Sequence, residues 1–398
     1  ISVEFNHPIW VLFSSGTTGK PKAITHSTGG ILIEQYKSHS LHQNIREGDR
    51  FFWNTTTGWM MWNYAIGSLL CGAKLCLYDG AANFPDIGVQ WRFAKSVKIN
   101  HFGNGSPLFI ASMKQNIKDV NNEDLNCIKT IGATGSPLSV EAFEWIQKKL
   151  PNAQIISLSG GTDICSAFIG GCTKLPVYSG FLQCNMLGAS IEAWNENGES
   201  VELITGELVI TEPLPSMPLF FWGDNDFKKY HDSYFNKNEG VWTHGDWIFI
   251  DKNKGILMQG RSDATLNRNG IRIGTSEIYS VLDKLKEVKD SLIIDLEINN
   301  SSKLILFIQT TSNLNNELKS KIHNLIKTKC SPRHTPNLIF SVSQIPYTIS
   351  GKKMEIPIKK ILLGQKVTNV ISKGAMKNPE CIDEFIGIKN QYLKSLDQ

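Results

Sequence analysis

Residues 14–22 form a short stretch of glycine, hydroxyl and lysine residues directly after the apolar segment 9–13. Glycines let backbone amides approach a phosphate closely, hydroxyl groups add hydrogen-bond donors, and lysines neutralise phosphate charge. The apolar run before the stretch predicts a strand, and residues 31–36 after it predict a helix. This arrangement predicts an α/β unit whose strand-to-helix loop binds phosphate.

The stretch is not a Walker A loop, which has four residues between its glycines and Ser or Thr after its lysine. Here two residues separate Gly16 from Gly19, and Pro21 follows Lys20. An exposed turn is the alternative, because Ser, Thr, Gly and Pro are also turn residues. The position between strand and helix favours phosphate contact. The candidate phosphate-binding residues are Ser14, Ser15, Gly16, Thr17, Thr18, Gly19, Lys20 and Lys22.

The 398-residue chain is long enough for two domains. Its first half alternates short apolar runs with amphipathic segments, which is typical of α/β units. Further strands are expected at residues 50–53, 74–78 and 128–131, with a helix at 140–150. Between residues 187 and 250 the character changes to short β runs separated by Gly, Asn, Asp and Pro, which predicts an antiparallel sheet. Those runs are 190–194, 207–211 and 247–250.

A domain boundary is expected at residues 260–263, followed by a compact α+β unit. Its predicted helices are 276–285 and 317–327, and its predicted strands are 292–296, 304–309 and 338–340. The last segment is polar and weakly patterned, so we expect a loosely packed tail. The predicted domains are therefore a large domain at 1–262, a small domain at 263–364 and a polar tail at 365–398.

Composition excludes several classes of protein. The net charge of +4 is spread without a basic stripe, so nothing indicates a nucleic-acid partner. The most apolar stretch, 64–78, is interrupted and falls short of the ~20 residues that a membrane helix needs. Eight scattered cysteines without a C-x-x-C pair indicate reduced thiols in the cytosol. No Cys, His, Asp and Glu cluster has transition-metal spacing.

The chain begins with Ile1 and has no signal-peptide pattern, so we expect a fragment or a processed chain.

Four further segments follow the loop in chain order: 159–163, 242–246, 260–278 and 346–353. Taken singly, they are explained as a capped turn, a turn before a strand, a surface salt bridge and an exposed lysine face. Together with residues 14–22, they resemble the motifs of the adenylate-forming superfamily, which includes acyl-CoA synthetases, adenylation domains of nonribosomal peptide synthetases and firefly luciferase. The resemblance implies an α/β fold: a large N-terminal domain with an antiparallel part, and a small mobile C-terminal α+β domain.

The resemblance also implies roles for residues in the large domain. The loop would fold over the β- and γ-phosphates of ATP. Thr162 would hydrogen-bond the α-phosphate or the acyl carboxylate, and Asp163 would hold Mg²⁺. The family has glutamate at this last place; aspartate offers the same oxygens with a shorter reach. Asp246 would accept hydrogen bonds from the ribose hydroxyls. A weaker match, 131–137, implies that Gly135 and Ser136 flank the adenine.

A second set of implied roles concerns the hinge and the small domain. Arg261 would contact the nucleotide and Arg272 the α-phosphate, because a guanidinium neutralises and orients phosphate oxygens. Asp263 would be the hinge, and Gly270 would lie on the coenzyme A tunnel. Lys352, on a Ser-Gly turn, would reach the substrate carboxylate and the α-phosphate. The neighbouring lysine at 353 is expected to be solvated.

The implied reaction has two steps. A carboxylate attacks the α-phosphorus of ATP, expelling pyrophosphate and forming an acyl-adenylate. The small domain then rotates, the lysine leaves, and the thiol of coenzyme A takes the acyl group and releases AMP. Negative charge that develops on the α-phosphate would be stabilised by Lys352, Arg272 and Thr162, so positioning dominates the chemistry. ATP, Mg²⁺ and coenzyme A are the implied cofactors.

Over nearly its whole length the chain resembles the short-chain branch of the superfamily, and within it the acetoacetyl-CoA synthetases. Acetyl-CoA synthetases carry tryptophan two places before the motif threonine, where this chain has Gly160. Loss of an indole would open room for acetoacetate, which is two carbons longer than acetate. Trp59, Met60 and Met61 would line the remaining wall. Plain core packing is the alternative for these three residues.

Several alternatives stay open. The chain could instead be an acetyl-, propionyl- or butyryl-CoA synthetase, or an adenylating domain that serves a carrier protein. A catalytically impaired remnant is the third alternative. Members of the superfamily have a large stretch before the phosphate loop, so the chain is expected to lack their N-terminal part. The expected partners are small molecules only, without nucleic acid or membrane, and the oligomeric state stays open.

Overall fold

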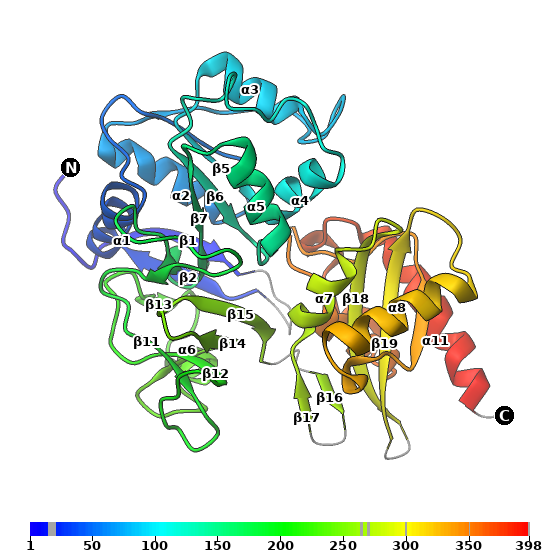
Figure 1. Ribbon diagram of the computed structural model, residues 1–398. Coiled ribbons are helices and arrows are strands. Elements are labelled where there is room, and N and C mark those ends of the chain that lie inside the picture. The colour runs from blue at the N-terminus through cyan, green and yellow to red at the C-terminus, as the bar shows by residue number, and fades with distance from the viewer. Residues whose placement is uncertain (15–20, 263–265, 269–270, 299–300, 350, 397–398) are drawn as a thin grey trace. The chain divides into compact units, whose positions relative to one another are not determined.

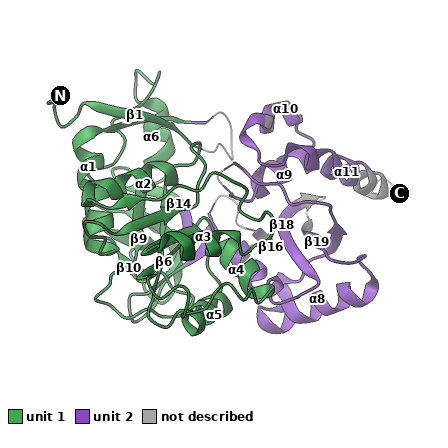
Figure 2. Cartoon of the chain, turned by 90° about the horizontal axis from the view of Figure 1, so that it is seen from above, with its two compact units in different colours: residues 1–14, 22–244, 248–257 green, residues 15–21, 245–247, 258–398 purple. Residues whose placement is uncertain are grey.

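The computed structural model describes residues 1–14, 21–262, 266–268, 271–298, 301–349 and 351–396. The chain divides into two compact units (Figures 1 and 2). Unit 1 comprises residues 1–14, 22–244 and 248–257, and unit 2 comprises 15–21, 245–247 and 258–398. The predicted boundary at 262–263 lies a few residues beyond the main division at 257–258.

A five-stranded parallel sheet forms the centre of unit 1 and bears out the α/β prediction for the first half. Helices follow four of its strands along the chain, as expected for a parallel sheet. In spatial order the strands are β4 (Lys74–Leu75), β3 (Arg50–Trp53), β5 (His101–Gly105), β6 (Thr130–Thr134) and β7 (Gln154–Ser157). The helices are α2 (Met61–Gly67), α3 (Val89–Val97), α4 (Ser106–Lys114) and α5 (Val140–Lys149).

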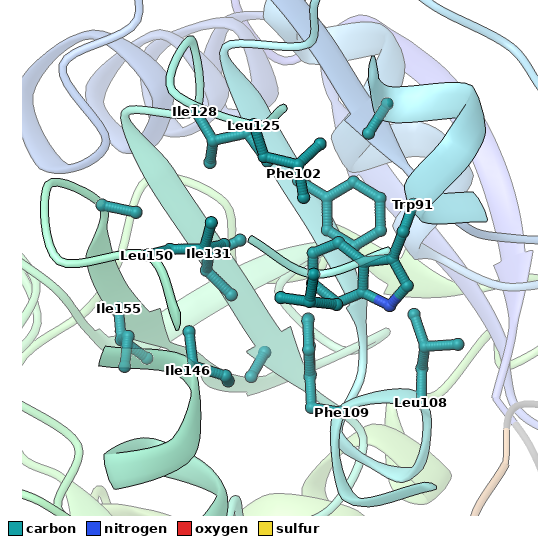
Figure 3. Packing of buried hydrophobic residues seen from close by; sticks show 14 of the residues in the cluster. Trp91, Phe102, Leu108, Phe109, Leu125, Ile128, Ile131, Ile146, Leu150 and Ile155 are labelled. Carbon is teal, nitrogen blue, oxygen red and sulfur yellow. The ribbon is translucent and has the colours of Figure 1, made fainter. Parts of the chain in front are cut away.

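One face of this sheet packs into a dry core with α3, α4 and α5 (Figure 3). Trp91 stacks on Phe102 with ring centroids 4.5 Å apart, and Phe109 meets both rings edge-on. All three side chains are buried. Full burial of a large apolar side chain contributes about 1.5–3 kcal/mol, so this cluster is a main source of stability for unit 1.

The strand order places polar loops at one edge of the sheet. The chain passes from β3 to β4 on one side, and β5 then pairs with β3 on the other side. In open α/β sheets, ligands bind beyond the carboxyl ends of the strands where the order reverses in this way. The segments that leave those ends are 54–60, 105–106, 134–137 and 158–163.

A smaller antiparallel sheet contains the beginning of the chain, and it corrects one prediction. β1 (Pro8–Phe13) pairs with β2 (Ala23–Ser27), which also pairs with β13 (Phe220–Phe221). Helix α1 (Thr28–Tyr36) begins only after β2, and its first turn is capped by the Ser27 hydroxyl. The phosphate-loop segment therefore closes a β-hairpin instead of leading directly into a helix.

The predicted antiparallel part of the first 260 residues is confirmed. One four-stranded sheet has the order β11-β12-β14-β15, and a three-stranded one has the order β10-β9-β8. A short helix, α6 (Lys228–Tyr234), precedes β14. The strands are β8 (Ser159–Gly161), β9 (Ser166–Gly170), β10 (Cys184–Asn185), β11 (Ile191–Trp194), β12 (Thr205–Ile210), β14 (Trp242–Ile250) and β15 (Ile256–Arg261).

Unit 2 reproduces the predicted helices and strands closely. β18 (Val288–Ile298) pairs antiparallel with β19 (Ser301–Thr310), which pairs parallel with β20 (Leu338–Ser341). Successive apolar residues of the first two strands enter two different cores, because side chains alternate across a strand. Leu292 and Phe307 pack with α9 (Glu355–Leu362), whereas Ile293 and Leu306 pack with α7 (Thr275–Leu282) and α8 (Asn316–Lys329). The two remaining strands are β16 (Leu266–Arg268) and β17 (Ile271–Ile273).

The end of the chain differs from the loosely packed tail that its polarity predicts. Residues 367–396 form α10 (Val367–Val370), two 3₁₀ turns and α11 (Ile382–Leu396). Phe385 is fully buried against Phe307, with ring centroids 4.8 Å apart. Scattered apolar residues among polar ones suffice here because they cover one face of β18 and β19.

Three further observations concern the predictions from composition. The eight cysteines are free thiols, two of them buried and six half-buried. Among the described residues, no helix is long and apolar enough to cross a bilayer. The same residues contain no group of three or more His, Cys, Asp and Glu side chains that could hold a metal ion.

Candidate active site

The loop after β6 and the segment after β7 lie side by side at the carboxyl edge of the parallel sheet. The Thr134 hydroxyl donates to the Leu158 carbonyl at 2.8 Å, and the Ser106 hydroxyl donates to the Ser136 carbonyl at 2.6 Å. Gly135 has φ of +87°, a conformation that favours glycine, and a side chain there would point toward the Trp59 ring. The structure thus brings two predicted sites, the adenine loop and Trp59, together.

Asp163 is the centre of a cluster of polar and aromatic side chains. Lys22 donates from Nζ to Asp163 Oδ1 at 2.8 Å, across 141 positions of sequence. The Tyr234 hydroxyl donates to the same oxygen. The Lys22 ammonium also lies 3.3 Å from the Tyr234 hydroxyl and 4.5 Å from the centroid of its ring. The second lysine of the phosphate loop is thereby joined to the predicted metal ligand.

The charge state of this cluster follows from its neighbours. Burial by itself raises the pKa of the Asp163 carboxyl, but the charges of Lys22 and His244 and the hydrogen bonds from Lys22 and Tyr234 outweigh it. The pKa of Asp163 therefore lies well below its usual range. Burial and the nearby carboxylate raise the pKa of Tyr234 well above its ordinary value. At neutral pH the carboxylate is ionised and the phenol remains a donor.

His26 supports the backbone of this cluster. The Trp10 indole donates to His26 Nδ1 at 3.2 Å, so the proton of a neutral ring resides on Nε2. Nε2 then donates to the Asp163 carbonyl at 2.9 Å. Burial lowers the pKa of His26, which favours this neutral form. No sequence motif indicates a role for His26. In the structure its hydrogen bond supports the main chain of Asp163.

An aromatic wall holds Tyr234 in place. Trp242 stacks on it with ring centroids 3.6 Å apart and an interplanar angle of 15°. The Trp242 indole donates to His244 Nδ1 at 3.3 Å, and the His244 ring meets Phe168 edge-on at 4.6 Å. Sequence reasoning missed Tyr234 entirely. The sequence indicates Tyr234 only weakly. It is an aromatic residue four positions after Tyr230 on a short helix, and it precedes the predicted ribose motif.

The two oxygens of Asp163, the predicted Mg²⁺ ligand, differ in their partners. Asp163 Oδ1 receives both the lysine and the tyrosine, and in the described part of the chain Oδ2 has no hydrogen-bond partner. Mg²⁺ is commonly held by one or two carboxylates together with substrate phosphates and water. One available carboxylate oxygen fits such a site, in which phosphates and water supply the other ligands.

Gly160 has different surroundings from those that the acyl-pocket prediction requires. A Cβ atom on Gly160 would lie 2.0 Å from the Ser166 carbonyl oxygen and 2.5 Å from the Ala167 Cα. Those atoms belong to β9, the antiparallel partner of β8. In this strand pairing a side chain at position 160 would clash with β9, so the pairing itself accounts for glycine here. Opening of a pocket by the missing side chain is not supported by this contact.

The other predicted wall residues belong largely to the core. Met60 and Met61 are 9% and 4% exposed, in a cluster with Trp53 and Tyr64. For these two methionines the core-packing alternative describes their surroundings. Trp59 is half-buried at the edge of the same cluster and is the one that adjoins Gly135. Of the three predicted wall residues, Trp59 is the one that the core does not enclose.

In unit 2, the predicted ribose ligand and the predicted nucleotide-binding arginine lie together. Arg261 Nη1 is 3.6 Å from Asp246 Oδ2. Gly245 has φ of +86°, and a Cβ atom there would lie 2.9 Å from Arg261 Nη2. The Ser262 amide donates to the Gly245 carbonyl at 3.0 Å. The backbone conformation favours glycine at 245, and a side chain there would displace the flexible end of Arg261.

Lys352 lies on a tight turn within unit 2. The Thr348 amide donates to the Lys352 carbonyl at 2.9 Å, and the Lys352 amide donates to Thr348 Oγ1 at 3.0 Å. Gly351 has φ of +79°, which suits the turn to glycine. The Lys352 side chain is exposed. Lys353, expected to be solvated, instead donates to Asp290 Oδ1 at 2.9 Å, so that expectation is wrong.

Several predicted site residues lie outside the described residues. They are Ser15, Gly16, Thr17, Thr18, Gly19, Lys20, Asp263 and Gly270. Arg272 is described by its backbone, which pairs with Asn267 between β17 and β16. The base of the phosphate loop is described: the Lys22 amide donates to Ser14 Oγ at 3.0 Å, and the Ser14 amide donates to the Lys22 carbonyl at 3.1 Å.

Comparison with known proteins adds to this geometry. The model of the AMP-binding enzyme family matches residues 2–217, more than half of the chain. The chain belongs to the AMP-binding enzyme family. The ion pair between Lys22 and Asp163 joins two of the motifs from which this family was expected, the predicted phosphate loop and the 159–163 segment.

Individual relatives are more specific. The chain is 41% identical over 391 residues to the acetoacetyl-CoA synthetase of Gallus gallus, which covers 97% of the chain and 58% of the relative. It is 41% identical over 390 residues to the acetoacetyl-coenzyme A synthetase of Rhizobium meliloti (97% and 60%). The solved acetoacetyl-CoA synthetase from Streptomyces lividans is 40% identical, with a TM-score of 0.92 over 98% of this chain and 60% of that one.

These likenesses confirm the predicted fold class, an adenylate-forming fold with α/β, antiparallel and small α+β parts. The chain spans about 60% of the length of the relatives that it matches. What the whole relatives do is therefore a matter for proposal in this chain.

Proposed function

We propose that this chain is part of an enzyme that joins acetoacetate to coenzyme A through an acetoacetyl-adenylate, consuming ATP and releasing AMP and pyrophosphate. The observation that carries the proposal is the 41% identity to acetoacetyl-CoA synthetases across 97% of the chain. The joined motifs around Asp163 support it. The cytosol is the proposed location, because scattered thiols without C-x-x-C pairs are typical of reducing compartments.

The first step is an attack of the acetoacetate carboxylate on the α-phosphorus of ATP. We assign Thr162 to hydrogen-bond the α-phosphate or the substrate carboxylate. Asp163 would hold Mg²⁺ through Oδ2, and the ion when bound would neutralise phosphate charge. The depressed pKa of Asp163 keeps that oxygen anionic across the physiological range. The ammonium of Lys22 then balances the buried carboxylate while Oδ2 stays available.

The phosphate loop acts with Asp163 in this proposal. Its two ends, Ser14 and Lys22, are hydrogen-bonded to each other. Because Lys22 also binds Asp163, the base of the loop is fixed relative to the metal ligand. Preorganisation of this kind lowers the reorganisation needed when ATP binds.

Unit 2 carries the remaining proposed roles. Asp246 would accept hydrogen bonds from the ribose, with Arg261 beside it to contact the nucleotide. Arg272 and Lys352 would stabilise charge on the α-phosphate during adenylation. Movement about Asp263 would then withdraw Lys352, and the thiol of coenzyme A would arrive past Gly270. The thiol loses its proton to solvent and its sulfur attacks the acyl carbon, the bond to AMP breaks, and the thioester and AMP leave.

The test is ATP–pyrophosphate exchange by the natural gene product that contains this chain. Acetoacetate, acetate, propionate and butyrate are compared, and the Streptomyces lividans enzyme serves as the reference. We expect acetoacetate to give the highest kcat/KM by at least tenfold. Equal or higher values with acetate, propionate or butyrate would favour another short-chain synthetase. Exchange without thioester formation from coenzyme A would favour a domain that serves a carrier protein.

A further inference from the structure

The two adjacent lysines of the 346–353 segment have opposite surroundings. The Lys352 side chain is exposed, whereas Lys353 is 20% exposed and its ammonium is 2.9 Å from Asp290 Oδ1. Lys353 also donates to the Ser291 carbonyl. At these adjacent positions, Lys353 is thus held against β18 while Lys352 is exposed.

Asp290 binds both sides of the turn that carries Lys352. Its Oδ1 accepts from Lys353 and its Oδ2 accepts from the Tyr347 hydroxyl at 2.8 Å. Tyr347 and Lys353 are themselves paired as an antiparallel bridge at the base of the turn. One carboxylate on β18 thus holds together Tyr347 and Lys353, the bridged residues on either side of the turn. We call Lys353, Asp290 and Tyr347 the clasp.

The platform under the clasp is fixed by its own hydrogen bonds. The Lys353 ammonium lies 4.0 Å from the centroid of the Tyr279 ring, a cation–π distance. The Tyr279 hydroxyl accepts from the Ile293 amide at 3.1 Å and donates to Glu355 at 3.0 Å. Three elements, α7, β18 and α9, therefore hold the ring in place. Movement of Lys353 would cost its contacts with Tyr279 on α7 and with Asp290 and Ser291 on β18.

The other side of the turn is bound by the segment before α11. The Ile349 amide donates to the Ala375 carbonyl at 3.0 Å, and the Lys377 amide donates to the Tyr347 carbonyl at 2.9 Å. The Tyr347 amide donates to Asn378 Oδ1 at 3.0 Å. The backbone of the turn is thus held from two directions, and the side chain of Lys352 extends from a fixed base.

We infer that Lys353 is a positioning residue: by holding Asp290 together with Tyr347, it fixes the backbone from which Lys352 reaches its substrate. The inference rests on the proposed role of Lys352 in adenylation. A displacement of about 1 Å in a catalytic group can cost about 100-fold in rate. Loss of the clasp should therefore lower the rate of adenylation without removing any group that touches substrate.

The chain offers a matched control. Lys359, on α9, donates to Asp295 Oδ1 at 2.6 Å and so forms another lysine–aspartate pair with β18. Lys353→Met and Lys359→Met each remove one ammonium and keep side-chain length. Lys353→Arg restores a cation that can reach Asp290 and tests for rescue. The three variants are made in the natural gene product.

The first readout is amide hydrogen exchange of residues 348–352, which does not depend on what the enzyme does. Lys353→Met should accelerate exchange at the Lys352 amide at least tenfold, whereas Lys359→Met leaves it within twofold. Unchanged exchange in Lys353→Met would overturn the clasp, whatever happens to activity.

The second readout separates the two half-reactions. We expect Lys353→Met to lower kcat for ATP–pyrophosphate exchange by 10- to 100-fold with KM for ATP within threefold, and Lys353→Arg to recover most of the loss. Thioester formation from supplied acetoacetyl-adenylate should stay within threefold. Equal loss of both half-reactions, or a loss matched by Lys359→Met, would overturn the inference. If Lys352→Ala itself leaves exchange intact, the proposed role of Lys352 fails, and the hydrogen-exchange result still decides on the clasp.

Discussion

Two regions of the molecule combine the same three side-chain types in different ways. Around Asp163 and around Asp290, a lysine donates to the carboxylate, a tyrosine hydroxyl donates to it too, and the ammonium lies over a tyrosine ring. The donors at Asp290 occupy both oxygens. At Asp163 both donors converge on Oδ1.

The two carboxylates differ in which of their oxygens accept hydrogen bonds. Asp163 keeps one oxygen available to a ligand, whereas both oxygens of Asp290 hold neighbouring segments of the fold. At Asp290, Lys353 and the Ser291 amide donate to Oδ1 and Tyr347 donates to Oδ2, so the carboxylate ties the two sides of the lysine turn together. Two donors on one oxygen keep Asp163 charged and oriented while its second oxygen stays available to a phosphate-bound cation. The predictions below test this contrast, beginning with the largest effect.

Removal of the charge at each aspartate should separate the two regions most clearly. We expect Asp163→Asn to lower ATP–pyrophosphate exchange by about 100- to 1000-fold, the range seen when a preorganised group of a catalytic site is lost. Asp290→Asn should lower it about tenfold, through displacement of the lysine turn. Rates are measured with saturating Mg²⁺, and circular dichroism checks the fold. Equal losses in the two variants would contradict the contrast.

Glycine requirements in the two regions also differ in kind. A Cβ atom at Gly160 would meet β9 backbone at 2.0 Å, whereas nothing lies within 4 Å of a Cβ atom at Gly351 and the constraint there is its φ of +79°. We expect Gly160→Ala to destabilise by about 3 kcal/mol, as strong overpacking does. Gly351→Ala should cost about 1–2 kcal/mol, the left-handed backbone penalty. Urea unfolding measures both, and a larger loss at Gly351 would contradict the prediction.

The contact between Gly160 and β9 also bears on the acid specificity that the sequence suggested. A pocket opened by a missing indole suggests Gly160→Trp as its test. Because a side chain at this place would have to displace the β9 backbone, loss of activity in that variant would say nothing about the acyl pocket. Trp59→Phe is the better variant. A change in the acetoacetate-to-butyrate ratio of kcat/KM by more than threefold would place Trp59 at the acyl group.

Acid should weaken the Asp163 cluster in a predictable direction. The folded-state pKa of Asp163 is depressed below the ~3.9 of an unfolded aspartate, so its contribution to stability is complete above that value and is lost as pH falls through the folded pKa. The free energy of unfolding of the wild type should therefore fall more steeply between pH 5 and pH 2.5 than that of Asp163→Asn. A difference of about 1.5–3 kcal/mol is expected, as for hydrogen bonds to charged groups. Parallel curves would show that the cluster contributes nothing to stability.

The sequence predicted unit 2 better than unit 1 for a physical reason. In β18 and β19 both faces are covered, so continuous apolar runs mark the strands and the helices show their own periodicity. Strand β5, the segment His101–Gly105, was missed because its sequence, His-Phe-Gly-Asn-Gly, has low strand propensity. The Trp53 indole packs directly against Gly103, where a Cβ atom would lie 2.1 Å from the ring. Only the folded sheet reveals that requirement.

The site was predictable where it follows motifs and unpredictable where it depends on long-range contacts. Lys22 and Asp163 were both named from local patterns, but nothing local indicates that they pair across 141 positions. Tyr234 and His26 belong to no motif and reach Asp163 only through the fold. Lys353 was misassigned because a lysine pair in sequence is typical of a solvated face, and its partner Asp290 lies on another element.

The smallest expected effect comes from the two tyrosine hydroxyls. Tyr234→Phe and Tyr347→Phe each remove one donor from a carboxylate that keeps its lysine, so each should cost about 1 kcal/mol of stability, or roughly fivefold in the folded-to-unfolded ratio. Their effects on activity should differ. Without Tyr234, Asp163 Oδ1 retains Lys22 alone and the carboxylate is free to rotate, so the apparent affinity for Mg²⁺ in the exchange assay should fall two- to fivefold. Without Tyr347, Mg²⁺ dependence should not change even though Asp290 Oδ2 loses its donor, because Asp290 has no proposed contact with phosphate or metal. A shift of Mg²⁺ affinity in Tyr347→Phe, or its absence in Tyr234→Phe, would mean that acceptor use does not distinguish the two carboxylates.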